Sequence, residues 1–128
     1  MKPARNTTPE LKRVLQLYVD RFNRRDWDGV RELISADARL NVAERFARKF
    51  SDAPYFFNYE RWPSPWKLAV GDVDGEPVVI MLERGADTWM AYSVVRLKVI
   101  GEQIDQIVDY AHSPWVVPAA DTVEIVSA

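Results

Sequence analysis

The chain has 128 residues, of which 48% are hydrophobic and 28% charged, a length and composition typical of one globular domain rather than a disordered chain. Its formal net charge is −2; because domains that bind DNA or RNA by themselves are usually basic, we expect no direct contact with nucleic acid. There is no cysteine and one histidine, His112, which excludes disulfides, thiolate nucleophiles and multi-histidine metal sites. We therefore expect neither a metal nor a cofactor.

The termini and the hydropathy pattern bear on location and domain organisation. The first residues are polar, and no stretch approaches 18 apolar residues, so neither a signal peptide nor a membrane span is expected and the chain is predicted to be cytoplasmic. The predicted organisation is a flexible N-terminus at 1–7, one domain at 8–118 and a C-terminal tail at 119–128.

The first half of the chain is predicted to be mostly helical. Thr8 and Pro9 suit a helix start, and apolar residues then recur at helical spacing as far as Phe22. Asp26 is expected to cap a second, shorter helix. Residues 36–42 alternate between apolar and polar, which predicts a short strand.

The middle of the chain is less regular. Residues 43–50 are predicted to form a short helix with a basic surface of Arg45, Arg48 and Lys49, either a solvated face or a contact for an anion or a protein. Residues 51–65 contain three prolines and many aromatic residues, and we expect them to form an irregular loop.

Strands are predicted from Trp66 onward, at 66–73, 77–83, 89–100 and 103–112. Asp74-Gly75 is a strong two-residue hairpin signal, and short turns make consecutive strands neighbours. The tail at 121–128 could add an edge strand or fray. Packing of this curved sheet against the first helix would close a cone, with the loop at 51–65 covering its open end.

The sequence is rich in aromatic residues, with five each of Trp, Tyr and Phe. Ligand pockets are mostly apolar with a few directed polar groups, and Tyr and Trp supply both. The residues most expected to line a pocket are Tyr18, Tyr55, Phe56, Trp62 and Trp66. The alternative is that they fill the core or form a dimer face.

Asp109 is the strongest candidate for chemistry, because its side of the last strand is expected to face the cone. Burial there would raise the pKa of a carboxyl group and suit it to act as a general acid or base. The alternatives are a structural Asp that accepts hydrogen bonds from Tyr or Trp, or one that faces solvent. His112 could assist, but residues three apart on a regular strand point to opposite faces, so a dyad needs a bulge or the strand end.

The order of elements resembles the NTF2-like superfamily, which includes ketosteroid isomerases, SnoaL-type polyketide cyclases and limonene epoxide hydrolases. The segment 101–110 is similar to the turn and last strand that are common in that group. Segments 18–28, 56–61, 66–69 and 107–110 are similar to the SnoaL-like domain at the C-terminus of some extracytoplasmic-function sigma factors. The resemblance covers about residues 8–118 and implies an α+β cone, with N-terminal helices packed in a curved antiparallel sheet.

Two departures from these relatives limit what the resemblance implies. The sigma factors carry two regions that bind DNA and polymerase ahead of this domain, whereas here about seven residues precede the first helix, so RNA polymerase is expected as a partner only within a larger sigma factor. Ketosteroid isomerases place a catalytic Asp near the end of the first strand, and the matching position here is Val42. A steroid-isomerase mechanism is therefore not expected.

Three functions follow as hypotheses. The first is a non-catalytic, regulatory domain that binds an apolar or aromatic small molecule, as an accessory to a sigma factor or another partner. The second is an enzyme of the SnoaL, epoxide-hydrolase or isomerase kind that uses Asp109 with Tyr18 or His112. The third is a dimerisation domain with a filled cone. A homodimer is expected through the outer face of the sheet, including Tyr92, Val94 and Arg96.

Overall fold

The structure is a computed structural model, and it describes residues 9–42, 47–50, 55–110, 116–120 and 123–127. It begins with helices α1 (Pro9–Asn23) and α2 (Trp27–Glu32). The apolar stripe of α1 is fully covered, with Leu15, Tyr18 and Phe22 at 0% exposure. Asp26 caps α2 as predicted, because its carboxylate accepts a hydrogen bond from the Gly29 amide at 3.0 Å.

One seven-stranded sheet follows, in the order β2-β1-β6-β5-β4-β3-β7. Strand β1 runs parallel to β6, and the other neighbouring strands are antiparallel. The strands are β1 (Ile34–Val42), β2 (Ala47–Lys49), β3 (Trp66–Val73), β4 (Glu76–Arg84), β5 (Trp89–Ile100), β6 (Gln103–Asp109) and β7 (Val123–Ser127).

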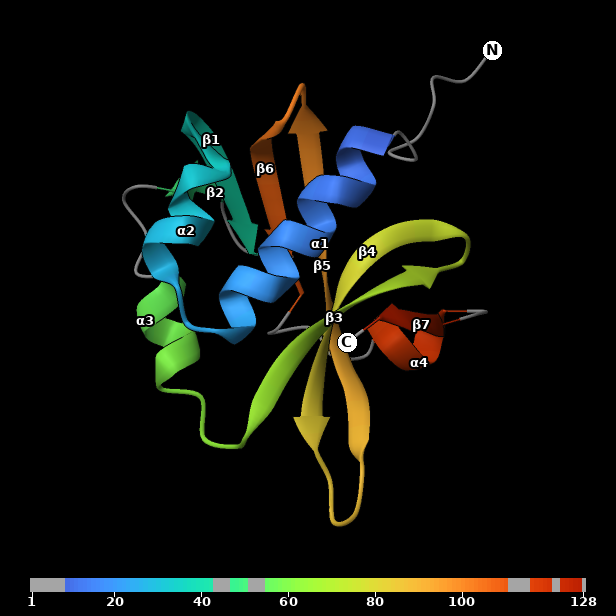
Figure 1. Ribbon diagram of the computed structural model, residues 1–128. Helices are drawn as coiled ribbons and strands as arrows, with labels where there is room; N and C mark the ends of the chain where they lie inside the picture. Colours follow the sequence, from blue (N-terminus) through green and yellow to red (C-terminus); the bar gives the residue numbers. More distant parts are fainter. Residues whose placement is uncertain (1–8, 43–46, 51–54, 111–115, 121–122, 128) are drawn as a thin grey trace.

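Both faces of the sheet are buried at its centre. Along β4, Val79 and Met81 join a large cluster with α1, whereas Val78 and Ile80 join a second cluster. Since neighbouring residues of a strand point to opposite faces, the first cluster marks an inner face and the second an outer face. Helix α1 crosses the sheet in Figure 1 and forms the inner layer.

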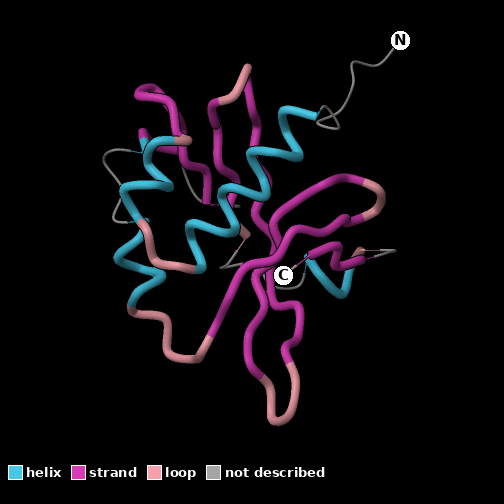
Figure 2. Tube along the Cα trace, in the orientation of Figure 1, coloured by secondary structure: helices cyan, strands magenta, loops and turns pink. Residues whose placement is uncertain are grey.

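The C-terminal segment contributes to the outer cluster. Val117 of α4 (Val116–Ala119) and Val123 of β7 pack against it, and Figure 2 shows both elements beside the β3–β4 hairpin. Strand β7 pairs with β3 at the edge of the sheet, which is the first of the two alternatives expected for the tail.

The middle of the chain departs from the prediction in two places. Residues 47–49, expected to be helical, form β2 and pair with 39–41 of β1, because hydrogen bonds to an open strand edge outweigh local helical preference. Arg45 lies outside the described residues. Residues 55–60, expected to be irregular, form helix α3 (Tyr55–Glu60), which buries Tyr55, Phe56 and Tyr59.

The surface predicted for dimerisation is also wrong in part. Val94 is buried in the outer cluster at 2% exposure, and Tyr92 packs instead against the inner cluster. Tyr92 changes face because β5 has a register shift against β4, between the pairs Met81–Ser93 and Leu82–Ala91, which interrupts the alternation of faces. Val94 does lie on the outer face, but the outer cluster buries it. Only Arg96 of the three residues is exposed.

Apart from the short helix α4, which was not predicted, the remaining differences are shifts of strand ends. Strand β1 begins at Ile34, two residues before the prediction, and β6 ends at Asp109 rather than at residue 112. No helix within the described residues is long and apolar enough to cross a membrane.

Candidate ligand-binding site

The inner face of the sheet encloses a cluster of aromatic rings centred on Phe22 of α1. Its ring lies within 4.9–6.2 Å, between centroids, of rings from α1, α2, α3 and β3. Those rings belong to Tyr18, Trp27, Tyr55, Phe56, Tyr59 and Trp66. Four of the five residues predicted to line a pocket are therefore gathered in one buried cluster. The fifth, Trp62, is half-buried and stacks on Tyr59.

Asp109 points into this aromatic interior, the direction expected from the sequence, and its side chain is 3% exposed. The hydroxyls of Tyr55 and Tyr59 both donate to its Oδ2 atom, each at 2.7 Å. Hydrogen bonds of this length to a carboxylate are of the strong, charge-assisted kind. The same contacts match the structural alternative, an Asp that accepts hydrogen bonds from Tyr.

A third tyrosine extends this network. The hydroxyls of Tyr18 and Tyr55 lie 3.2 Å apart. A tyrosine has one hydroxyl proton, and that of Tyr55 already points at Asp109, so Tyr18 is the donor in this contact. The protons thus run from Tyr18 to Tyr55 to Asp109, and from Tyr59 to Asp109. We call these four residues the Asp109 network.

The electrostatics of the Asp109 network keep its tyrosines un-ionised. Burial raises the pKa of Tyr18, Tyr55 and Tyr59 well above the ordinary value of 10, because a phenolate would lose its hydration. The charge of Asp109 raises the same three pKa values further by repelling a second negative charge. All three hydroxyls are therefore protonated at neutral pH.

The backbone explains why Asp109 lies where it does. It is the last residue of β6, flanked by Val95 of β5 on one side and Val42 of β1 on the other. The position matching the catalytic Asp of ketosteroid isomerases, Val42, is thus the backbone neighbour of Asp109. The carboxylate of this chain enters the cone from β6 instead of β1.

Helix α3, which supplies Tyr55 and Tyr59, is held by tryptophans. The indole N–H of Trp66 donates to the Tyr59 carbonyl at 3.0 Å, and that of Trp27 donates to Glu60 at 2.8 Å. Arg25 stacks over the Trp66 ring, 3.8 Å from its centroid. The predicted pocket residue Trp66 therefore positions the network as well as packing beside it.

Two site predictions need comment. His112 lies outside the described residues, so its part in a dyad stays a prediction. Tyr59 was not among the predicted pocket residues, although its spacing of four from Tyr55 places both on one face of a helix. Recognising α3 would have revealed it. Among the described residues, no three His, Cys, Asp or Glu side chains are grouped to hold a metal ion.

No protein-family model and no curated protein matches the sequence, but solved structures do. A protein from Kribbella flavida that is described as a ketosteroid isomerase is 23% identical to this chain. The two structures have a TM-score of 0.58 over 82% of this chain and 79% of the other. An LEH-like epoxide hydrolase of M. tuberculosis is 13% identical, with a TM-score of 0.58 over 88% and 98%.

A third neighbour is an NTF2-like protein of unknown function from Cytophaga hutchinsonii, 13% identical, with a TM-score of 0.54 over 85% of this chain and 93% of the other. At these identities the likeness concerns architecture rather than activity. It agrees with the order of elements, the curved sheet and the helical inner layer. This chain has the NTF2-like α+β fold, a cone of N-terminal helices packed within a curved sheet.

Proposed function

We propose that this chain is a small-molecule-binding domain whose ligand, an apolar or aromatic compound, enters the cone and bonds to the Asp109 network. The observation that carries the proposal is the convergence of two tyrosine hydroxyls on one oxygen of a buried carboxylate. A ligand site needs a few directed polar groups among apolar walls. The aromatic cluster supplies the walls and the network supplies those groups.

A core that serves only stability does not need a buried carboxylate with three tyrosine hydroxyls. Burying a carboxylate is costly, and replacing buried polar groups by well-packed apolar ones is often neutral or stabilising. The network therefore fits a site better than a filled core, the third hypothesis. The fold supports the same choice, since two structural neighbours are named for enzymes, an isomerase and an epoxide hydrolase.

The arrangement of protons favours binding over oxyanion chemistry. An enzyme that stabilises an oxyanion needs donors aimed at the substrate, whereas the protons of Tyr55 and Tyr59 are aimed at Asp109. The network offers a ligand the oxygen lone pairs of its tyrosines. We propose that the ligand's polar group is a hydrogen-bond donor. A regulatory role within a sigma factor is part of the same proposal. It is supported by the similarity of the segments at 18–28 and 56–61 to the SnoaL-like domain of some extracytoplasmic-function sigma factors.

The second candidate function is an acid–base enzyme that uses Asp109. Two hydroxyls at 2.7 Å from the carboxylate are within the distance needed for proton transfer. In that case the ligand is consumed, and the Asp109 network carries a proton to or from it. Binding without turnover and binding with turnover share one site, so one experiment can separate them.

The test is ligand discovery by native mass spectrometry, in which a library of apolar and aromatic compounds is offered to the wild-type protein. The proposal predicts that retained compounds are lost from Asp109→Asn and kept by Asp105→Asn, the same substitution on the same strand. The retained compounds are then released and compared with the starting compounds by mass and by NMR, because an isomerisation or a cyclisation leaves the mass unchanged. Recovery of unaltered compounds indicates binding alone, and a product that Asp109→Asn fails to form indicates the enzyme. Equal retention by both variants would contradict the proposed site.

A further inference from the structure

A hollow lies on the outer face of the sheet, between β5 and β6. It has a volume of about 260 Å³ and is lined by Arg96, Leu97, Lys98, Gln106 and Val108. Lys98 is exposed, and Gln106 and Val108 are half-buried. These side chains are therefore accessible to a ligand from solvent. We call this site the β5–β6 hollow.

A row of polar residues crosses the sheet at one end of the β5–β6 hollow. Gln106 of β6 pairs with Lys98 of β5 on one side and with Arg39 of β1 on the other. Arg39 in turn pairs with Lys49 of β2. Four neighbouring strands thus place three basic residues and one amide side by side.

This row points to the outer face, away from the cone. The chain neighbours of Arg39 and Lys98, and the residue after Gln106, all belong to the inner cluster or pack against it. Since neighbouring residues of a strand point to opposite faces, the three side chains of the row point outward. Lys49 shares the face of Arg39, because the two residues lie directly opposite each other.

The positive charges of the row have no acidic partner within the described residues. The ion pairs there join other side chains, and none involves Arg39, Lys49 or Lys98, which are all exposed. Like charges directly opposite each other on paired strands are destabilising, as Arg39 and Lys49 are here. A chain with a net charge of −2 therefore carries a local excess of positive charge at a cost in stability.

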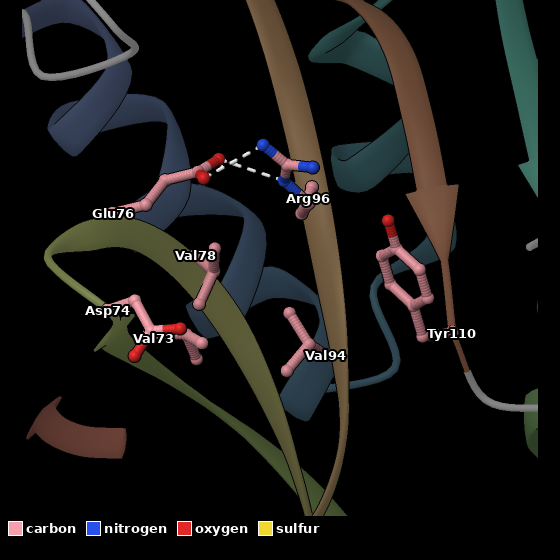
Figure 3. Close-up of a pocket in the computed structure, with 7 residues that line it drawn as sticks. All are labelled: Val73, Asp74, Glu76, Val78, Val94, Arg96 and Tyr110. Atoms are coloured by element: carbon pink, nitrogen blue, oxygen red, sulfur yellow. Dashed lines mark hydrogen bonds and ion pairs between the residues drawn. The ribbon is translucent and has the colours of Figure 1, made fainter. Parts of the chain in front are cut away.

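Arg96, the other basic residue of the hollow, is already neutralised. Its Nε atom donates to Glu76 Oε2 at 2.9 Å, and its Nη2 atom donates to Oε1 at 2.8 Å. Figure 3 shows both bonds. Because Glu76 belongs to β4, on the side of β5 away from β6, this pair holds the guanidinium toward β4. Lys98 is thus the cation that the hollow offers to a ligand.

Two carboxylates are close in sequence to the row but lie on its other side. Strands β1 and β6 run parallel, and along them Asp37 precedes Arg39 and Asp105 precedes Gln106. The hollow extends in the opposite direction, toward Val108, and among the described residues no acidic side chain lines it. An anion in the hollow is therefore next to the basic row and is separated by that row from both acids.

The donors of the row suit a phosphoryl group. Such a group carries about −1.5 to −2 charge at neutral pH and has three acceptor oxygens. Since neighbouring strands lie about 4.8 Å apart, the Cα atoms of Arg39 and Lys98 are about 10 Å apart, and both long side chains can reach one group above Gln106. A carboxylate has one charge and two oxygens, so it would leave one of these three donors unused.

We propose that the β5–β6 hollow binds the phosphoryl group of a small molecule, held by Lys98, Arg39 and the side-chain amide of Gln106. The phosphoryl group belongs either to inorganic phosphate or to a phosphate ester, whose organic body would contact Val108. This site is on the opposite face of the sheet from the cone and is independent of the ligand proposed there.

The test compares inorganic phosphate, phenyl phosphate and benzoate at constant ionic strength and at a pH above about 7, where phosphate is mostly a dianion. Each is titrated into the isotopically labelled protein, and NMR follows the side-chain amide of Gln106 and the backbone amide of Lys98. We expect both phosphates to bind roughly fivefold or more tightly than benzoate, as one additional exposed ion pair would give. Tighter binding of phenyl phosphate than of inorganic phosphate would identify an ester as the ligand, and equal binding would identify phosphate itself.

Four variants locate the site. Lys98→Gln and Arg39→Gln should each weaken phosphate binding about fivefold. Lys12→Gln removes the same charge from the exposed face of α1 and should leave binding unchanged. Lys49→Gln should raise the free energy of unfolding of the phosphate-free protein, because it relieves the repulsion with Arg39.

Three outcomes would overturn the proposal. Benzoate binding as tightly as the phosphates would show that the hollow does not select a phosphoryl group. Equal weakening of phosphate binding by Lys12→Gln and Lys98→Gln would indicate general attraction between the anion and positive charge. A variant with both Lys98→Gln and Arg39→Gln that keeps a native NMR spectrum and full affinity for phosphate would exclude the row as the site.

Discussion

One oxygen atom of Asp109 accepts hydrogen bonds from two tyrosine hydroxyls, and the buried position of this carboxylate depends on these bonds. Each bond at 2.7 Å compensates part of the hydration that the carboxylate loses on burial. Tyr18 reaches the carboxylate only through Tyr55. The tyrosine hydroxyls of the Asp109 network therefore differ in importance, and the difference can be measured.

Removing one direct donor should cost more than removing the indirect one. We expect Tyr59→Phe to lower the free energy of unfolding by about 1.5–3 kcal/mol, the usual range for a hydrogen bond to a charged group. Tyr18→Phe, which loses a bond between two neutral hydroxyls, should cost about 1 kcal/mol. Urea denaturation measures both, with Tyr92→Phe, a tyrosine outside the network, as the control. Equal costs for all three variants would contradict this ranking.

The three buried tyrosines also predict how stability depends on pH. Their pKa values are raised in the folded state, while the unfolded chain ionises near pH 10. The unfolded state therefore loses protons first, and stability falls as pH rises above 10. Each tyrosine contributes about 1.4 kcal/mol per pH unit.

The check is tyrosinate absorbance during unfolding at high pH. The signal from these three residues should appear in step with unfolding, not before it, and the slope of stability against pH should be smaller for Tyr55→Phe. Ionisation of all five tyrosines in the native protein near pH 10 would show that the cluster is not sealed from solvent.

At the scale of elements, α3 is the part that tertiary contacts hold in place. A six-residue helix is too short to be stable alone in water, and α3 is anchored by Trp66 and Trp27. We expect Trp66→Phe to speed amide exchange in α3 while leaving β4 and β5 protected, as hydrogen-exchange mass spectrometry would reveal. Trp89→Phe, on the outer side of the sheet, is the matched control and should leave α3 unchanged. Uniformly faster exchange throughout the chain would mean a global loss of stability.

Strand β7 depends on a glycine of its neighbour. A Cβ added to Gly71 would lie 2.4 Å from the backbone oxygen of Glu124 and 2.4 Å from a methyl of Ile80. The methyl can move, but the backbone of β7 cannot do so without leaving β3. Gly71→Ala should therefore release residues 123–127, giving fast amide exchange there and little change in α1. Unchanged protection of β7 would contradict this packing.

The elements that were predicted correctly are those with a clear hydrophobic period or a specific turn signal in the sequence. The stripe of α1 and the hairpin signal at Asp74-Gly75 depend on local chemistry and are found as expected. Strand β2 and helix α3 were not predicted because contacts with distant parts of the chain determine their conformation. Strand β2 pairs with the edge of β1, and three rings of α3 pack against Phe22.

The same distinction applies to the site. The direction of Asp109 followed from strand alternation and the resemblance, whereas Tyr59 required α3 to be recognised. The face of Tyr92 could not be predicted from the sequence, because a register shift of β5 lies between it and Val94. No local pattern in the sequence of β5 indicates that shift.

For the whole molecule, one sheet buries a different cluster on each of its two faces. The inner face holds aromatic rings and a carboxylate with its tyrosines, whereas the outer face is covered in part by α4 and β7. Homodimerisation stays a prediction, and Val94 cannot contribute to it because it is buried. Among large apolar side chains, Ile125 and Val126 of the edge strand β7 are exposed at 47% and 62%.

The central claim is that a ligand binds in the cone at the Asp109 network. Its most direct test is the crystal structure of the protein with a compound selected by native mass spectrometry. We predict that the compound's polar atom lies within hydrogen-bonding distance, about 3 Å, of an oxygen of Tyr18, Tyr59 or Asp109, with its apolar body against the rings around Phe22. A compound found on the outer face, with the rings around Phe22 packed as they are without it, would contradict the account.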